Sequence, residues 1–409
     1  LDEIVEAAIT KALEGKYQKL EPVGRGSYGQ VWKVRRFSDK SEFVCKIMAQ
    51  EKQHRYEAEA HCLTGCDHFG IVRLVDDFGS DFGPVICLEF ADGGDLSKRI
   101  KSCAKAVPKQ PFNDDEIGLT MVQMTMALQH IHSRRMLHRD IKAANVLLTS
   151  RGLVKLSDFG FSRQFDGTVS QAVADTFLGT PYYLAPELWK RQKYGKKADV
   201  WSLGIILYEM LMLKRPFYAS NMRGLMNNVL QCQYDEPPAT TNPEFKELLK
   251  MMLRVDPRER PSCADLLNTP IMQRYWQMFL ANTNASPYVS DAEKQIVNSQ
   301  SEALKITLAQ PSSNETLEVD DDTDIIEEEE EDDSDADTDK NDILLSGDDY
   351  WGFNSNRNSQ TGQVTNSSTA WMDASASASA SASVSLSSTI GSNSNPIAPQ
   401  HKRIDELDV

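Results

Sequence analysis

The residues best suited to chemistry stand together in one short stretch, His138-Arg139-Asp140-Ile141-Lys142-Ala143-Ala144-Asn145. It offers a carboxylate that can take up a proton, an ammonium group that can offset negative charge, and a carboxamide oxygen that can bind a hard metal ion. The alternative is a polar loop between two apolar elements, with its charges facing water. Asp158-Phe159-Gly160, thirteen residues after Asn145, supplies a second metal-binding carboxylate and favours the chemical interpretation.

These two segments match the motifs H-R-D-x-K-x-x-N and D-F-G, and the chain thereby resembles the eukaryotic serine/threonine protein kinases. The resemblance implies that Asp140 accepts or orients the proton of the attacking hydroxyl, and that Lys142 steadies the transferred γ-phosphate. It also implies ATP as cofactor, with Mg²⁺ bound by Asn145 and Asp158. A lysine two residues after the aspartate resembles the serine/threonine class and not the tyrosine class.

A glycine-rich segment precedes these motifs, and its residues are Gly24, Arg25, Gly26, Ser27, Tyr28, Gly29, Gln30 and Val31. The spacing G-x-G-x-x-G also fits a dinucleotide-binding fold, in which the last glycine opens a helix. Here residues 31–34 alternate like a strand, so a hairpin over the phosphates is the better interpretation. By resemblance, Lys46 holds the α- and β-phosphates. Val44 stands where the family has alanine and is expected to crowd the adenine pocket.

The partner of Lys46 is expected in the helical segment 55–65, where Glu57 and Glu59 are both candidates. We favour Glu59 from the register of the residues that follow it. Residues 85–96 are expected to form a buried strand and a glycine-rich connector, and the resemblance implies that they contact the nucleotide. By resemblance the contacts are Leu88 as gatekeeper, the backbone from Glu89 to Ala91 for adenine, and Asp95 for the ribose. Asp95 is equally well explained as a helix N-cap.

Residues between Asp158 and the Ala185-Pro186-Glu187 motif are rich in serine and threonine. By resemblance Thr180 bridges Asp140 and Lys142, and Thr176 is the expected activating phosphosite, with its phosphate paired to Arg139. An unmodified threonine is the competing interpretation. The resemblance also implies that Asp199 tethers the catalytic loop and that Arg260 pairs with Glu187.

The charge of the chain is concentrated in one place. Residues 311–345 contain 17 of the 60 acidic residues and one of the 44 basic residues, which accounts for the net charge of −16. The remaining 43 acids are balanced by 43 bases. A near-neutral domain shows no electrostatic footprint for nucleic acid.

Seven scattered cysteines favour reduced thiols and a cytoplasmic or nuclear protein. The cluster His61, Cys62, Cys66 and His68 lacks paired C-x-x-C spacing and is better explained by core packing than by zinc. The apolar run 200–213 is too short to cross a bilayer and indicates a buried helix. We expect no membrane partner. No signal peptide is evident, and the start at Leu1 leaves open whether residues precede it.

These patterns predict an α+β, two-lobed kinase fold with a β-rich N-lobe and a larger helical C-lobe. We expect a helical extension at residues 1–16, the catalytic domain at 17–280, and a disordered tail at 281–409, rich in acids and in Ser, Ala and Asn. Within the tail, Ser334 and Ser346 fit acidophilic kinases and the segment 349–353 could dock on a partner, although a solvated tail is the simpler account.

The loop around Asp140 and the segment 177–184 look most like the NIMA-related kinases, which are often tied to the cell cycle and to cilia or flagella. The resemblance implies protein substrates and activation by an upstream kinase or in trans. Phe161 resembles kinases that favour serine, and Ala144 replaces an acid used by basophilic relatives. The alternative function is a pseudokinase scaffold that recruits partners through its tail. The presence of Lys46, Asp140, Asn145 and Asp158 argues against it.

Overall fold

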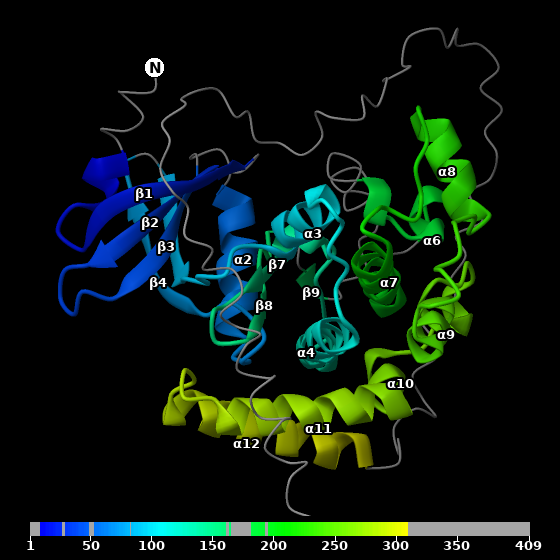
Figure 1. Ribbon diagram of the computed structural model, residues 1–409. Coiled ribbons are helices and arrows are strands. Elements are labelled where there is room, and N and C mark those ends of the chain that lie inside the picture. The colour runs from blue at the N-terminus through cyan, green and yellow to red at the C-terminus, as the bar shows by residue number, and fades with distance from the viewer. Residues whose placement is uncertain are drawn as a thin grey trace, which may run out of the picture.

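A five-stranded antiparallel sheet forms the N-terminal lobe, with its strands in the order β1-β2-β3-β5-β4 (Figure 1). The computed structural model describes residues 9–26, 29–48, 53–81, 83–160, 163–164, 181–192 and 195–309. The strands are β1 (Tyr17–Gly26), β2 (Gly29–Arg36), β3 (Glu42–Met48), β4 (Leu74–Ser80) and β5 (Gly83–Glu89).

Both faces of this sheet are covered. On one face, helical residues 9–13 bury Ile9 and Leu13 against Tyr17 and the sheet. The rest of the helical extension expected at residues 1–16 falls largely on residues 1–8, which lie outside the described residues. On the other face, helix α2 (Gln53–Thr64) packs on β4 and β5. Both faces of β5 are covered, and its residues are therefore apolar along most of the strand. A strand with one face in water would alternate apolar and polar residues.

The expectation of reduced thiols was wrong for one pair of cysteines. Cys45 of β3 and Cys87 of β5 stand directly opposite each other in the strand register, with their Cα atoms 4.2 Å apart, and form a disulfide. Both are fully buried in the sheet. The other five cysteines are free.

Helices build the second lobe around α4 (Asp114–Ser133) and α7 (Lys196–Met212), which are largely buried. Asn113 and Glu116 form a reciprocal capping box at the start of α4. Gly118 allows α11 to pack closely against α4, because a Cβ atom at this position would lie 2.3 Å from the ring of Tyr275 in α11. The other helices are α3 (Leu96–Lys105), α6 (Pro186–Trp189), α8 (Met222–Leu230), α9 (Pro243–Met252), α10 (Cys263–Leu267), α11 (Pro270–Ala285) and α12 (Asp291–Ala309).

The two-lobed α+β arrangement expected from the sequence is confirmed, but the folded part extends beyond the expected boundary at residue 280. Helix α11 continues to Ala285, and α12 lies beside it at the lower edge of Figure 1. Val297 and Ser301 of α12 are buried, so this helix belongs to the folded unit. Residues 310–409 lie outside the described residues. Among the helices that the structure describes, none is long and apolar enough to cross a membrane.

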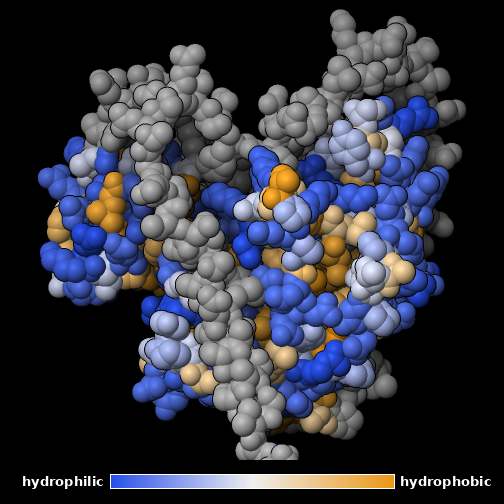
Figure 2. All heavy atoms as spheres, viewed as in Figure 1, coloured by the Kyte–Doolittle hydropathy of each residue, from blue (hydrophilic) through white to orange (hydrophobic). Residues whose placement is uncertain are grey.

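Hydrophilic residues cover most of the described surface in Figure 2, with hydrophobic residues showing between them on the helical lobe. The apolar side chains gather inside, in one small cluster on the outer face of the sheet and one large cluster that joins α2 to the C-lobe helices.

Candidate active site

The segment 138–145 is a loop between β6 (Met136–Leu137) and β7 (Val146–Leu148), closed by the short helix η2 (Ala143–Asn145). Asp199 of the buried helix α7 holds it in place. Its carboxylate accepts hydrogen bonds from the backbone N–H groups of His138 and Arg139, each at 3.1 Å. The Asp199 carboxylate also lies 2.8 Å from Nε2 of His132 in α4. Two core helices therefore fix the backbone of this loop.

Asp140, Lys142 and Asn145 converge within the loop. Lys142 Nζ lies 2.7 Å from Oδ2 of Asp140, and Asn145 Nδ2 donates to the same oxygen at 2.8 Å and to the Asp140 carbonyl at 2.9 Å. Burial raises the pKa of Asp140, and the charge of Lys142 opposes that rise. A buried carboxyl with a pKa above its ordinary value suits proton transfer.

Lys46 of β3 joins the two lobes at the centre of the site. Its Nζ atom lies 2.7 Å from Oε2 of Glu59 and 3.1 Å from Oδ1 of Asp158. Glu59, the candidate favoured from the sequence, is buried, whereas Glu57 on the same helix is exposed. Burial acts to raise the pKa of Asp158, but the charges of Lys46 and Lys142 outweigh it and the pKa is lowered. Asp158 is therefore ionised at neutral pH.

The backbone is strained beside the chemical groups. Arg139 and Asp158 have φ angles of +65° and +66°, a left-handed conformation that non-glycine residues seldom adopt. Phe159, just after Asp158, is buried with its ring centroid 4.8 Å from that of His138. This contact connects the D-F-G segment to the loop that carries Asp140.

The glycine-rich segment forms the β1–β2 hairpin, with Gly26 opposite Gly29. A strand follows it and no helix does, so the dinucleotide-fold alternative fails. Gly29 has φ +156°, and a Cβ atom there would lie 2.1 Å from the carbonyl oxygen of Ile47 in β3. Val31 of β2 stands opposite Lys46 in β3. Ser27 and Tyr28 lie outside the described residues.

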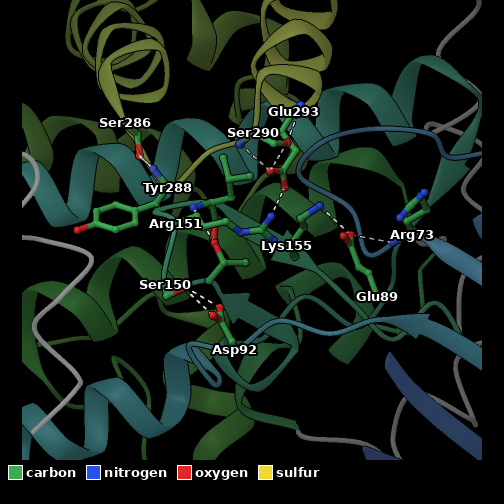
Figure 3. A network of polar contacts seen from close by, with 12 residues as sticks. Arg73, Glu89, Asp92, Ser150, Arg151, Lys155, Ser286, Tyr288, Ser290 and Glu293 are labelled. Carbon is green, nitrogen blue, oxygen red and sulfur yellow. Dashed lines mark hydrogen bonds and ion pairs between the residues drawn. The ribbon is translucent and has the colours of Figure 1, made fainter. Parts of the chain in front are cut away.

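The connector between the lobes is braced from behind by charged side chains (Figure 3). Glu89 Oε1 lies 2.7 Å from Lys155 Nζ and accepts the Arg73 backbone N–H at 2.9 Å. The backbone N–H of Glu89 donates to the Arg73 carbonyl at 3.0 Å. Leu88 is buried and Ala91 is partly exposed at the site.

Asp95 has the structural role that the sequence allowed as an alternative. It is the N-cap of α3, and its Oδ1 accepts the backbone N–H of Lys98 at 2.8 Å. The contact with the ribose stays a prediction from the resemblance. Thr176 and Thr180 lie outside the described residues, as does Phe161.

Sequence reasoning missed a buried pair beneath the catalytic loop. Tyr183 Oη donates to Oε2 of Glu209 at 2.6 Å and accepts the backbone N–H of Ala143 at 3.4 Å. The sequence does contain a signal for this pair, because Glu209 places a carboxylate within the apolar run 200–213 of α7. Lys155, which supports Glu89, gave no comparable signal.

The donor set of the site fits ATP with Mg²⁺. Asp158 supplies carboxylate oxygens, and Asn145 turns its NH₂ group to Asp140, which leaves its carbonyl oxygen for a cation. Lys46 and Lys142 bring two ammonium groups to the same region for phosphate oxygens. When bound, Mg²⁺ would offset the negative charge of the phosphates.

The sequence profile of the family described as "Protein kinase domain" matches residues 17–272. "Putative serine/threonine-protein kinase A" of Trypanosoma brucei brucei is 41% identical over 307 residues, which cover 74% of this chain and 71% of that protein. "Serine/threonine-protein kinase Nek1" of Mus musculus is 34% identical over 271 residues, 65% of this chain and 22% of that protein. "Serine/threonine-protein kinase Nek3" of Mus musculus is 38% identical over 253 residues, 61% of this chain and 48% of that protein. The chain therefore belongs to the protein kinase family and is a serine/threonine protein kinase.

Proposed function

We propose that this kinase transfers the γ-phosphoryl group of ATP, bound with Mg²⁺, to serine hydroxyls, and also to threonine hydroxyls, of protein substrates. The observation that carries the proposal is the double contact of Lys46 with Glu59 and Asp158. This arrangement aims one ammonium group at the phosphates and sets the metal-binding carboxylate beside it.

Within this site each side chain has a proposed role. Asp140 orients the attacking hydroxyl and accepts its proton, Lys142 offsets charge on the transferred phosphoryl group, and Asn145 and Asp158 hold the metal ion. Support for the role of Asp140 comes from Asn145 and Lys142, which both contact its Oδ2 and so keep the proposed proton acceptor in place. Ala144 is exposed on this loop and carries no acid, which supports substrates without a strict basic consensus.

Regulation by phosphorylation of Thr176, by an upstream kinase or in trans, completes the proposal. Support comes from Arg139, whose backbone is fixed by Asp199 in the strained conformation beside Asp140. A phosphate on the segment 161–180 that reached the Arg139 guanidinium would order the substrate-binding end of that segment.

The test is a comparison of the parent, Thr176→Ala and Thr180→Ser, after incubation with ATP and Mg²⁺, by phosphopeptide mass spectrometry and casein phosphorylation. We expect phosphate on Thr176 and a loss of about 10-fold or more in Thr176→Ala, whereas Thr180→Ser keeps its hydroxyl and stays active. Full activity of Thr176→Ala would refute activation at this residue without refuting the kinase activity.

A further inference from the structure

Gln300 of α12 joins the C-terminal extension, the largely helical residues 273–309 that follow the matched kinase domain, to the turn after α2. Its Nε2 donates to the carbonyl of Asp67 at 3.0 Å, and its Oε1 accepts the backbone N–H of Phe69 at 2.9 Å. One amide thus satisfies two backbone groups of the same turn, over 230 residues away in sequence. Gln300 lies outside the residues 17–272 matched by the family profile.

The turn held by Gln300 connects the two parts of the catalytic site. Helix α2, which carries Glu59, ends at Thr64, just before this turn. On its far side, Leu156 N–H donates to the Gly70 carbonyl at 2.8 Å and Val72 N–H donates to the Leu156 carbonyl at 2.9 Å. Leu156 stands two residues before Asp158. The turn therefore lies between the helix that carries Glu59 and the strand that leads to Asp158.

Helix α12 is anchored firmly enough to hold this turn. Glu293 pairs with Arg151 of the turn after β7, as Figure 3 shows, and accepts the Ser290 N–H and hydroxyl at the start of the helix. Val297 is fully buried between these contacts and Gln300. The Phe69 ring also stacks on Phe279 of α11, with the centroids 5.3 Å apart.

The turn after β7, which contacts α12, is also hydrogen-bonded to the connector between the lobes. Ser150, beside Arg151, donates its backbone N–H to Oδ1 of Asp92 at 2.7 Å. Figure 3 places this contact and the Arg151–Glu293 pair in one network behind the connector. Helix α12 thus contacts the same turn that is hydrogen-bonded to Asp92 in the connector.

We propose that Gln300 is a positioning residue for the Lys46–Glu59 ion pair. It fixes the turn 67–69, the turn fixes the end of α2, and α2 presents Glu59 to Lys46. The Trypanosoma brucei brucei relative matches 74% of this chain, more than the family profile covers, so its similarity continues into the extension. The inference rests on the proposed phosphoryl transfer from ATP.

The test compares the full-length parent with Gln300→Met and Gln295→Met in casein phosphorylation, with kcat and the KM for ATP determined separately. Methionine keeps the length and helix propensity of glutamine but removes both hydrogen bonds. Gln295 is exposed on the same helix and serves as the matched control.

We expect Gln300→Met to raise the KM for ATP about fivefold, with Gln295→Met equal to the parent. If the effect passes through Glu59, Gln300→Met will change KM less than about twofold in a Glu59→Gln background. An unchanged KM in Gln300→Met, an undiminished effect without Glu59, or a variant that fails to fold would overturn the positioning role. An inactive parent would refute the proposed function itself.

Discussion

Arg260 and Glu187 form a doubly hydrogen-bonded ion pair, with Nη1–Oε1 and Nη2–Oε2 distances of 2.7 and 2.5 Å. Both side chains are almost fully buried. Arg260 also donates to the carbonyls of Arg254 and Lys197. The pair, expected from the sequence, joins the A-P-E segment to the start of α7.

Breaking this pair from one side should be costly. Arg260→Met leaves the Glu187 carboxylate buried without its partner, and we expect a loss of about 3–5 kcal/mol in the free energy of unfolding. The matched control is Arg258→Met, because Arg258 pairs with Asp256 on the surface and its loss should change stability little. Urea unfolding of both variants measures the difference, and equal stabilities would contradict the assignment.

Substitution of the two glutamates of α2 should have different effects on kinase activity. Glu59→Gln removes the charge that holds Lys46, and we expect kcat/KM for ATP to fall about 10- to 100-fold, as for the loss of a hydrogen bond between charged groups. Glu57→Gln changes an exposed residue on the same helix and should leave the rate unchanged. Steady-state phosphorylation of casein at varied ATP provides the measurement. A similar loss in both variants would show that the choice of Glu59 is wrong.

Glu209 should make stability depend on pH. Burial raises its pKa to about 7, although Tyr183 and Arg215 oppose the shift. The folded protein therefore binds this proton more tightly than the unfolded chain. The resulting stabilisation is complete below the ordinary carboxyl pKa and is lost as the pH rises through about 7. Glu209→Gln stays neutral while it can still accept the Tyr183 hydroxyl.

We therefore expect the melting temperature of Glu209→Gln, relative to that of the parent, to increase between about pH 5 and about pH 8. Thermal melts of the two proteins across this range test the expectation. A difference that is independent of pH would mean that Glu209 does not titrate there.

The disulfide of the sheet predicts a definite thiol count. With Cys45 and Cys87 joined, alkylation of the denatured, unreduced protein should label five cysteines, whereas alkylation after reduction should label seven. Intact-mass spectrometry distinguishes the two. In Cys45→Ala the unreduced protein should label six, because the partner thiol becomes free. Seven labels in the unreduced parent would contradict the bond.

The chemistry of the site could be predicted because its groups occur at fixed short spacings. Asp140, Lys142 and Asn145 share one loop, so their convergence follows from local sequence. The pairing of Lys46 with Glu59 also followed, since the helix period left two candidates and the register selected one. Because the residues of such a motif are close in sequence, their proximity in the fold can be predicted without a structure.

Contacts that depend on tertiary register could not be predicted in the same way. The Cys45–Cys87 bond requires the alignment of β3 with β5, which no local pattern specifies. Helix α12 mixes apolar residues with Ser, Asn, Gln and charged residues, and Val297 and Ser301 are its buried positions. Its burial comes from α11 and the turn after α2, so Gln300 had no signature in the sequence.

The central claim is that Lys46 and Asp158 act together on ATP, and phosphoryl transfer measures it most directly. Purified parent, Lys46→Met and Asp158→Ala are incubated with radiolabelled ATP, Mg²⁺ and casein, and phosphate incorporation is followed over time. We predict a measurable rate for the parent and, for each variant, a rate reduced by at least about 100-fold. Equal incorporation in all three proteins, or none in the parent even after an activating incubation, would contradict the account.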